Sequence, residues 1–175
     1  MEKQKNRQEI YEGKVIHVVK DGVILDDGTS AVREVVKHNG GVCIALKDDQ
    51  YYYMVRQYRY AQSKEMLEFP AGKIEKNENP DDAIIREVEE ETGFCAKNIR
   101  NLGSIVPTCG YSSEVIYLYY GEVDKYVGQN FDVDERINLE KYTLKEIKEM
   151  IKKNIIDDAK TIALLYRLQI EGIDE

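Results

Sequence analysis

The sequence contains no apolar run close to the roughly 20 residues that a helix needs to span a bilayer. Its first residues, MEKQKNRQEIYEGK, are polar and include no apolar stretch suited to a signal peptide. The three cysteines have no C-x-x-C spacing, and the two histidines, His17 and His38, are far apart in the chain and fit no metal-ligand pattern. These absences predict a cytoplasmic protein without membrane association, whose cysteines are small buried hydrophobic residues.

Basic residues are also scarce relative to acidic ones. The chain has 25 Lys or Arg residues against 33 Asp or Glu residues, and its formal net charge is −8 at pH 7. Because non-specific nucleic-acid binding requires clustered Lys and Arg, this charge argues against DNA or RNA as a partner. An acidic chain still binds anionic ligands where metal ions mediate the contact. With 175 residues, 42% of them hydrophobic, the chain is long enough to bury a real core.

The first third of the sequence is patterned as β-structure. Short segments rich in Val, Ile and aromatic residues alternate with turn signals. The predicted strands are Lys14–Lys20, Val23–Leu25, Val32–Lys37, Val42–Leu46 and Tyr51–Tyr60. The predicted turns are Asp21-Gly22, Asp26-Asp27-Gly28 and Asn39-Gly40-Gly41.

The clearest helix pattern runs over Asn79–Thr92. Asn79 is a good N-cap, Pro80 fits the first helical position, and Gly93 is a typical helix stop. Further helices are expected at Thr143–Lys153 and Ala159–Gln169, further strands at Ile99–Val106, Val115–Val123 and Ile137–Tyr142, and an acidic loop at Gly128–Asp134. This order of elements predicts an α+β fold, with a mixed sheet and helices packed on it.

The helix at Asn79–Thr92 crowds carboxylates onto one side. Residues three and four apart share a helix face, so Glu87, Glu90 and Glu91 are expected to lie together, with Arg86 able to orient Glu90. Like charges at this spacing destabilise a helix by several tenths of a kcal/mol per pair. A hard divalent cation reverses that effect, because carboxylate oxygens are the ligands that Mg²⁺ prefers. The alternative is a solvated acidic helix face.

The spacing of these acids resembles the signature of the Nudix hydrolases, G-x5-E-x7-R-E-U-x-E-E-x-G-U, where U is aliphatic or bulky and apolar. The matching residues are Gly72, Glu78, Arg86, Glu87, Val88, Glu90, Glu91, Gly93 and Phe94. The resemblance covers nearly the whole chain, from about Glu9 to Gln169. It implies a Nudix-type α/β/α sandwich over residues 41–175, preceded by an N-terminal antiparallel β region, residues 1–40, that forms a dimer.

Nudix hydrolases cleave a nucleoside diphosphate linked to another moiety, and the resemblance implies this reaction here. It implies Mg²⁺ as the cofactor, with Mn²⁺ as a possible substitute. The implied metal ligands are the carbonyl of Ala71 and the carboxylates of Glu87, Glu90 and Glu91. Arg86, together with Glu78, would hold the loop and the helix of the catalytic site together.

Four segments, AVREVVKH, VRQYRYA, EFPAGKIE and DAKTIALL, are most similar to the ADP-ribose pyrophosphatases within this family. The similarity implies hydrolysis of ADP-ribose to AMP and ribose 5-phosphate by a homodimer. Arg33, with Glu34 beside it, and Arg56 would contact the substrate, and Tyr11 would stack on the adenine. The alternative for both arginines is a salt bridge, and for Tyr11 it is packing.

One stretch departs from the subfamily pattern. The loop PTCGYSSE, Pro107–Glu114, has Cys109 where a Pro marks specificity for ADP-ribose, although Glu114 is kept as a candidate ribose or phosphate contact. The substrate therefore stays open: GDP-mannose or NADH is the enzymatic alternative, and an ADP-ribose sensor without hydrolytic activity is the non-enzymatic one.

A general base must take a proton from the attacking water. In the subfamily a Glu on a loop before a late strand performs this step, and DVDERINL is the corresponding segment. Glu135 matches best, with Asp134 and Asp132 as alternatives; a solvated acidic loop would explain the same residues without any role in catalysis.

Overall fold

The computed structural model describes residues 1–130 and 136–173. By its internal contacts the chain divides into two compact units, one formed by Met1–Gly40 with Val106–Val115 and the other by Gly41–Ile105 with Ile116–Glu175. No helix within the described ranges has both the length and the apolar character needed to cross a membrane.

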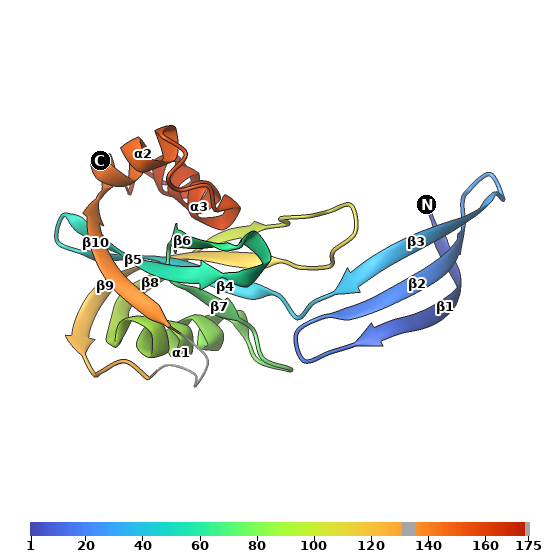
Figure 1. Cartoon of the computed structure of the whole chain (residues 1–175), viewed down its shortest axis with the longest axis horizontal. Helices are drawn as coiled ribbons and strands as arrows, with labels where there is room; N and C mark the ends of the chain where they lie inside the picture. Colours follow the sequence, from blue (N-terminus) through green and yellow to red (C-terminus); the bar gives the residue numbers. More distant parts are fainter. Residues whose placement is uncertain (131–135, 174–175) are drawn as a thin grey trace. The chain divides into compact units, whose positions relative to one another are not determined.

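The first unit is a three-stranded antiparallel sheet in the order β1-β2-β3 (Figure 1). Its strands are β1 (Lys3–Glu12), β2 (His17–Ile24) and β3 (Ser30–Lys37). Residues 106–115 join the end of β3, where the Val36 amide donates to the Tyr111 carbonyl at 2.8 Å and the Ser113 amide donates to the Val36 carbonyl at 2.9 Å. The predicted N-terminal antiparallel β region is confirmed.

The predicted turn at Asp21-Gly22 is wrong, because β2 runs straight through it. Arg7 of β1 binds Asp21 through two hydrogen bonds of 2.8 and 2.7 Å. A Cβ on Gly22 would lie only 2.3 Å from Oδ1 of Asn6, so the glycine leaves room for a side chain of the neighbouring strand. Cross-strand contacts to β1 therefore override the local turn signal, and β1 itself was missing from the expected elements.

The described part of the second unit contains a seven-stranded mixed sheet in the order β10-β5-β4-β9-β8, with β6 on β5 and β7 on β4. The strands are β4 (Gly41–Asp48), β5 (Tyr51–Arg59), β6 (Lys64–Glu68), β7 (Ala71–Lys73), β8 (Phe94–Ile105), β9 (Ile116–Tyr126) and β10 (Ile137–Thr143). A short 3-10 helix, Tyr60–Gln62, links β5 to β6. Strands β4 and β9 are parallel, whereas the other pairs are antiparallel.

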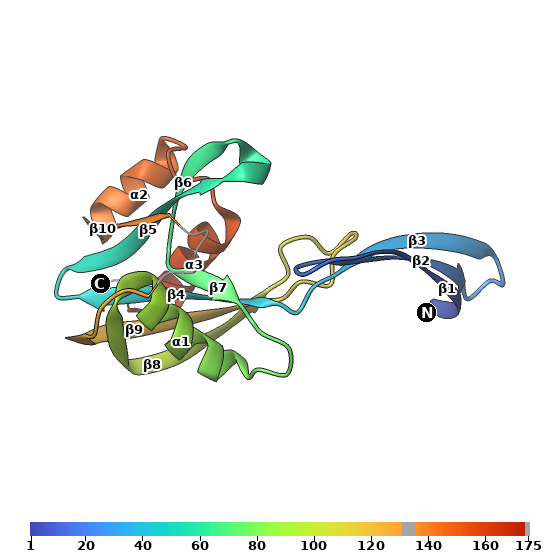
Figure 2. The same ribbon diagram turned by 60° about the horizontal axis from the view of Figure 1, so that its bottom comes forward.

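Helices cover both faces of this sheet. Helix α1 (Pro80–Thr92) lies on one face, and α2 (Leu144–Lys152) and α3 (Ala159–Ile170) lie on the other (Figures 1 and 2). Alternate residues of β4 point into the two resulting cores: Val42, Ile44 and Leu46 pack with α1, and Cys43 and Ala45 pack with α2 and α3. Burial on both faces explains the continuous apolar run, and the α/β/α sandwich is confirmed.

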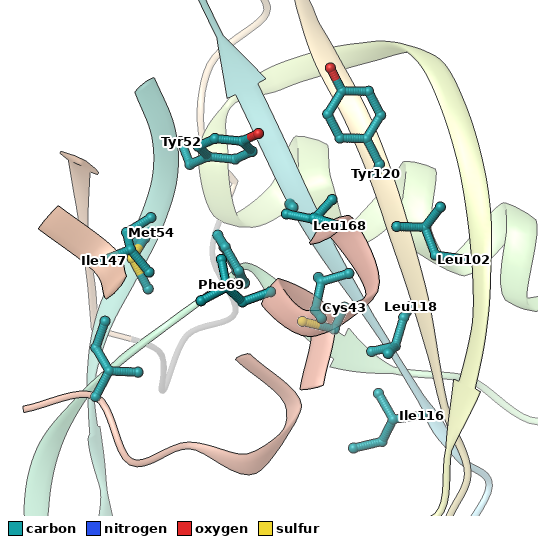
Figure 3. Close-up of a cluster of buried hydrophobic side chains, with 14 of the residues drawn as sticks. Cys43, Tyr52, Met54, Phe69, Leu102, Ile116, Leu118, Tyr120, Ile147 and Leu168 are labelled. Atoms are coloured by element: carbon teal, nitrogen blue, oxygen red, sulfur yellow. The ribbon is translucent and has the colours of Figure 1, made fainter. Parts of the chain in front are cut away.

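The core beneath α2 and α3 holds Phe69, which precedes the segment Gly72–Phe94 that resembles the Nudix signature and is called the box below. Figure 3 shows Phe69 among Met54, Ile147, Cys43 and Leu168, and Phe69 is fully buried. The expectation that every cysteine is buried is confirmed only for Cys43. Cys43 is buried and Cys95 is half-buried, but Cys109 is exposed, because it lies in the 106–115 loop rather than in a strand with two covered faces.

Candidate active site

The helix at the centre of the site begins and ends as its sequence predicts. Asn79 accepts a hydrogen bond from the Asp81 amide at 3.0 Å, and Pro80 occupies the first turn. Gly93 ends α1 in the left-handed conformation, with φ of 75°. A Cβ at Gly93 would lie 2.9 Å from the Gln129 amide nitrogen, so both the backbone angle and the packing require glycine there.

Arg86 joins the acidic side chains of the box. Its Nε and Nη2 donate to the two oxygens of Glu78 at 2.9 and 3.0 Å, and its Nη1 donates to Glu87 and Glu90, both at 2.9 Å. Nη2 also donates to the Lys73 carbonyl at 3.1 Å, which ties the loop before α1 to the helix. The hydrogen bond from Arg86 holds the pKa of Glu78 below its usual value, so this carboxylate stays charged.

Two other carboxylate contacts converge on the backbone of Ala71 and Gly72. The buried Glu91 accepts a hydrogen bond from the Ala71 amide at 2.9 Å. Glu87 lies so close to Gly72 that a Cβ there would be 1.8 Å from its carboxylate carbon. The glycine of the motif is thus a steric requirement, because any side chain at position 72 would occupy the place of the Glu87 carboxylate.

These residues fit a hard divalent cation by the chemistry of their donors. Glu87 and Glu91 supply carboxylate oxygens next to the Ala71–Gly72 backbone, which also carries a carbonyl. Within residues 1–130 and 136–173, no three His, Cys, Asp or Glu side chains are arranged to hold a metal ion by themselves. Backbone, water or substrate oxygens would therefore complete the coordination, as is usual for Mg²⁺.

A groove of about 440 Å³ runs along the outer side of α1. It is lined by Asp82, Ile85, Glu89 and Glu90 of the helix and by Val127 and Asn130. The segment on its far side is fastened to the end of α1: the Val127 amide donates to the Gly93 carbonyl at 2.7 Å and the Asn130 amide donates to the Glu90 carbonyl at 3.1 Å. These bonds satisfy helix carbonyls that would otherwise lack partners.

A buried ion cluster is formed at Glu68, three residues before Ala71 in the chain. Glu68, only 1% exposed, accepts two hydrogen bonds from Arg59 at 2.7 and 2.8 Å and also contacts Lys160. Burial alone would raise the pKa of Glu68, but the hydrogen bond from Arg59 and the charge of Lys160 outweigh it and the pKa is lowered. These three residues lie in the segments VRQYRYA, EFPAGKIE and DAKTIALL, but no sequence pattern predicts their ion cluster.

Arg56, singled out as a diphosphate contact, forms a double hydrogen bond with Glu140 of β10, at 2.6 and 3.1 Å. Tyr142, two residues further along β10, donates to the same carboxylate. The hydrogen bond from Arg56 lowers the pKa of Glu140. The structure therefore gives Arg56 a salt bridge that fixes its guanidinium on the sheet.

The remaining predicted site residues of the described chain lie in the first unit. Arg33 is bound to Glu2, with Nε 3.0 Å from the carboxylate, and Glu34 and Tyr11 are exposed. Glu114 is half-buried, with a carboxylate oxygen 3.6 Å from Nδ1 of His38. The predicted base Glu135 and its alternatives Asp132 and Asp134 lie outside the described residues.

Known proteins are similar to this chain in fold and in sequence. The solved crystal structure of an ADP compounds hydrolase has the same fold, with a TM-score of 0.86 over 98% of this chain and 95% of that one, at 19% sequence identity. A methanol dehydrogenase activator of Bacillus methanolicus is 36% identical and an ADP-ribose pyrophosphatase of Bacillus subtilis (strain 168) is 32% identical, each over 97% of this chain and 94% of the relative. A GDP-mannose pyrophosphatase of Enterobacter sp. (strain 638) is 30% identical over 81% of this chain and 79% of its own length.

A family model described as the NUDIX domain matches residues 37–165. The match includes the whole of the segment in which Arg86 binds its three carboxylates and in which Glu87 and Glu91 face Gly72 and Ala71. The chain belongs to the Nudix family of hydrolases.

Proposed function

We propose that this Nudix hydrolase cleaves the diphosphate of ADP-ribose, giving AMP and ribose 5-phosphate, with Mg²⁺ held at the box. The observation that carries the metal-dependent reaction is the convergence of Glu87 and Glu91 on the backbone of Ala71 and Gly72. The substrate rests on the 32% identity to an ADP-ribose pyrophosphatase along nearly the whole chain.

The roles of the box residues follow from their contacts. Glu87, Glu91 and the Ala71 carbonyl would hold the cation, and the more exposed Glu90 would ligate or support it. When bound, the ion supplies charge neutralisation for the diphosphate and a lowered pKa for the attacking water. Arg86 holds the acids of the loop and the helix in register, so that they need no rearrangement when substrate arrives.

The substrate contacts are assigned by resemblance. Arg33, with Glu34 beside it, would contact the substrate, Glu114 would contact its ribose or phosphate, and Tyr11 would stack on the adenine; all belong to the first unit. We further propose that residues 1–40 form the interface of a homodimer and that 41–175 form the catalytic domain. Arg56 would reach the diphosphate from its position beside Glu140. Glu135 would act as general base, taking a proton from the attacking water.

A panel of nucleotides tests the substrate. ADP-ribose, GDP-mannose and NADH are each incubated with Mg²⁺, and released AMP or GMP is quantified. The proposal requires ADP-ribose to give the highest kcat/KM, and it fails if another member of the panel is turned over as fast. GDP-mannose is the serious competitor, because the GDP-mannose pyrophosphatase of Enterobacter sp. (strain 638) is 30% identical and Cys109 stands where the resemblance implies a specificity-marking Pro.

The Glu91→Gln variant tests the metal assignment and the non-enzymatic alternative. Loss of one charged ligand is expected to lower kcat by about 10²-fold or more while the fold is kept, which circular dichroism and thermal unfolding would check. Unchanged turnover in this variant would refute the ligand role. Tight binding of ADP-ribose by the wild type, with no Mg²⁺-dependent product, would favour the sensor.

A further inference from the structure

The N-terminus of α3 is joined to the segment between β6 and β7 by a chain of buried hydrogen bonds. The Phe69 amide donates to Oγ1 of Thr161 at 3.0 Å, and this hydroxyl donates to Oδ2 of Asp158 at 2.6 Å. Asp158 is the N-cap of α3 and also accepts from the Thr161 amide at 2.9 Å. Because Thr161 is fully buried, the Phe69 amide depends on this hydroxyl for its hydrogen bond.

The residues next in sequence make a second contact between the same two segments. Lys160 binds the buried carboxylate of Glu68 and lies 3.0 Å from Oδ1 of Asp158. Two consecutive residues, Glu68 at the end of β6 and Phe69 directly after it, are thus bound to two consecutive residues of α3. Lys160 binds Glu68, and Thr161 binds Phe69. The Phe69 ring is anchored in the core between β5 and α3 (Figure 3), so the backbone here is fixed on two sides.

The same backbone reaches the Nudix box within three residues. The Pro70 carbonyl accepts from the Ile44 amide of β4 at 2.9 Å. The Ala71 amide then donates to Glu91, and Gly72 lies against Glu87. Contacts to α3 at Glu68 and Phe69 are therefore followed by contacts to α1 at Ala71 and Gly72, with only Pro70 between them, and its carbonyl is itself bound to β4.

We propose that Lys160 and Thr161 are positioning residues for the catalytic site: from α3 they fix the backbone of residues 68–72, so that Ala71 and Gly72 meet Glu91 and Glu87 in the geometry that binds the cation. The inference rests on the proposed function in one respect, that Glu87 and Glu91 are metal ligands. It assigns the DAKT segment a part in metal affinity and turnover, which packing of α3 alone would not give it.

The test compares the same substitution at two threonines, the buried Thr161 of α3 and Thr143, the N-cap of α2. Thr161→Val removes the hydroxyl and keeps the shape, and Thr161→Ser restores a hydroxyl. Thr143→Val is the matched control, because the Thr143 hydroxyl also accepts a backbone hydrogen bond at a helix N-terminus, from the Glu146 amide. Thr143 differs in its location: it pairs with Tyr51, the first residue of β5, whereas Arg59, which binds Glu68, is the last. Mn²⁺ affinity is measured by titration calorimetry without nucleotide, and amide exchange is measured at Ala71.

Thr161→Val is expected to weaken Mn²⁺ binding by about 10-fold or more, as loss of an outer partner of a metal site does. Exchange at the Ala71 amide should accelerate, and kcat should fall with little change in KM. Thr161→Ser should recover most of each value. Thr143→Val should lower the melting temperature but leave Mn²⁺ affinity and Ala71 exchange as in the wild type.

If Thr161→Val does not fold, the same Mn²⁺ affinity and Ala71 exchange are measured for Lys160→Met, which has its own control. Lys64→Met removes an ion pair to Asp157, which joins the same two parts of the chain at the surface. The inference is overturned if Lys160→Met or Thr161→Val has the Mn²⁺ affinity and Ala71 exchange of its control. Failure of the wild type to hydrolyse ADP-ribose would instead refute the proposed function, while the metal and exchange measurements would still decide the role of α3.

Discussion

Replacing Gly72 with Ala would place a methyl group where the Glu87 carboxylate lies. The new Cβ would be 1.8 Å from Cδ of Glu87 and 2.0 and 2.2 Å from its oxygens, whereas ordinary contact begins near 3.4 Å. The carboxylate must therefore move by about 1.2–1.6 Å, the difference between these distances. Gly72 does not have a positive φ, so alanine fits its backbone and the perturbation is confined to the carboxylate.

The expected effects on activity and on stability differ sharply. A misplacement of about 1 Å in a catalytic group lowers the rate by roughly 10²-fold, which corresponds to about 2.7 kcal/mol of barrier. The fold is affected far less, because the displaced atoms are the end of a flexible side chain and an off-rotamer torsion costs about 0.5–1.5 kcal/mol. Gly72→Ala should therefore retain a near-normal free energy of unfolding and lose most of its activity.

Steady-state hydrolysis of ADP-ribose and urea unfolding measure the two effects on the same protein. Gly121→Ala is the matched control, because its Cβ would lie 3.0 Å from Cδ1 of Ile44, the end of a core side chain, and the atoms nearest to it belong to no residue of the box. Overpacking of this kind destabilises by about 1–3 kcal/mol, so the control should unfold more easily and keep its kcat/KM. A Gly72→Ala protein within about threefold of wild-type kcat/KM would show that the Glu87 position does not matter for catalysis.

Three further predictions concern the fold around the site. Gly93→Ala should lower the free energy of unfolding by about 1–2 kcal/mol because of the left-handed backbone alone. The loss should be larger still because the new Cβ would lie 2.9 Å from the Gln129 amide nitrogen, and chemical denaturation measures it. Glu140→Gln should destabilise the protein at neutral pH. Because the hydrogen bond from Arg56 lowers the pKa of Glu140 from 4.5, the stability it contributes is complete above that pH and is lost as the pH falls through the lower folded-state pKa, so thermal unfolding curves of variant and wild type should converge in acid. Asn79→Ala should cost about 1 kcal/mol by removing the N-cap of α1, and an unchanged urea midpoint would contradict the capping role.

How well the sequence predicted an element depended on where its stabilising contacts lie. Helix α1 was placed correctly from Asn79 and Gly93 because both signals act on the adjacent backbone. Strand β1 was missed because all ten of its residues are exposed, so it has no apolar alternation to detect. Its position depends on pairing with β2 and on contacts such as that of Arg7 with Asp21. A pattern of neighbouring residues in the sequence does not predict such contacts.

The same distinction applies to the site. The box can be recognised from spacing, since its acids and Arg86 lie on two adjacent helix turns and the loop before them, where periodicity fixes their neighbours. The hydrogen bond between Phe69 and Thr161 joins residues 92 positions apart, and it arises only once β6 and α3 have packed on the sheet. Arg59 illustrates the limit: no local pattern singles it out, yet it binds the buried Glu68 next to the Ala71 segment.

The placement of the acids on α1 is unfavourable for the helix itself and fits the cation site proposed for them. Glu89, Glu90 and Glu91 fall in the last turn, where the helix dipole is negative, and that turn has no basic residue. Each such carboxylate is unfavourable by about 0.3–1 kcal/mol at a helix C-terminus. Arg86 offers one positive charge to Glu78, Glu87 and Glu90, so most of the negative charge of the box stays uncompensated by it. A sequence selected for helix stability alone would put Lys or Arg in this turn, whereas a site that must hold a cation keeps the carboxylates and accepts the lower helix stability.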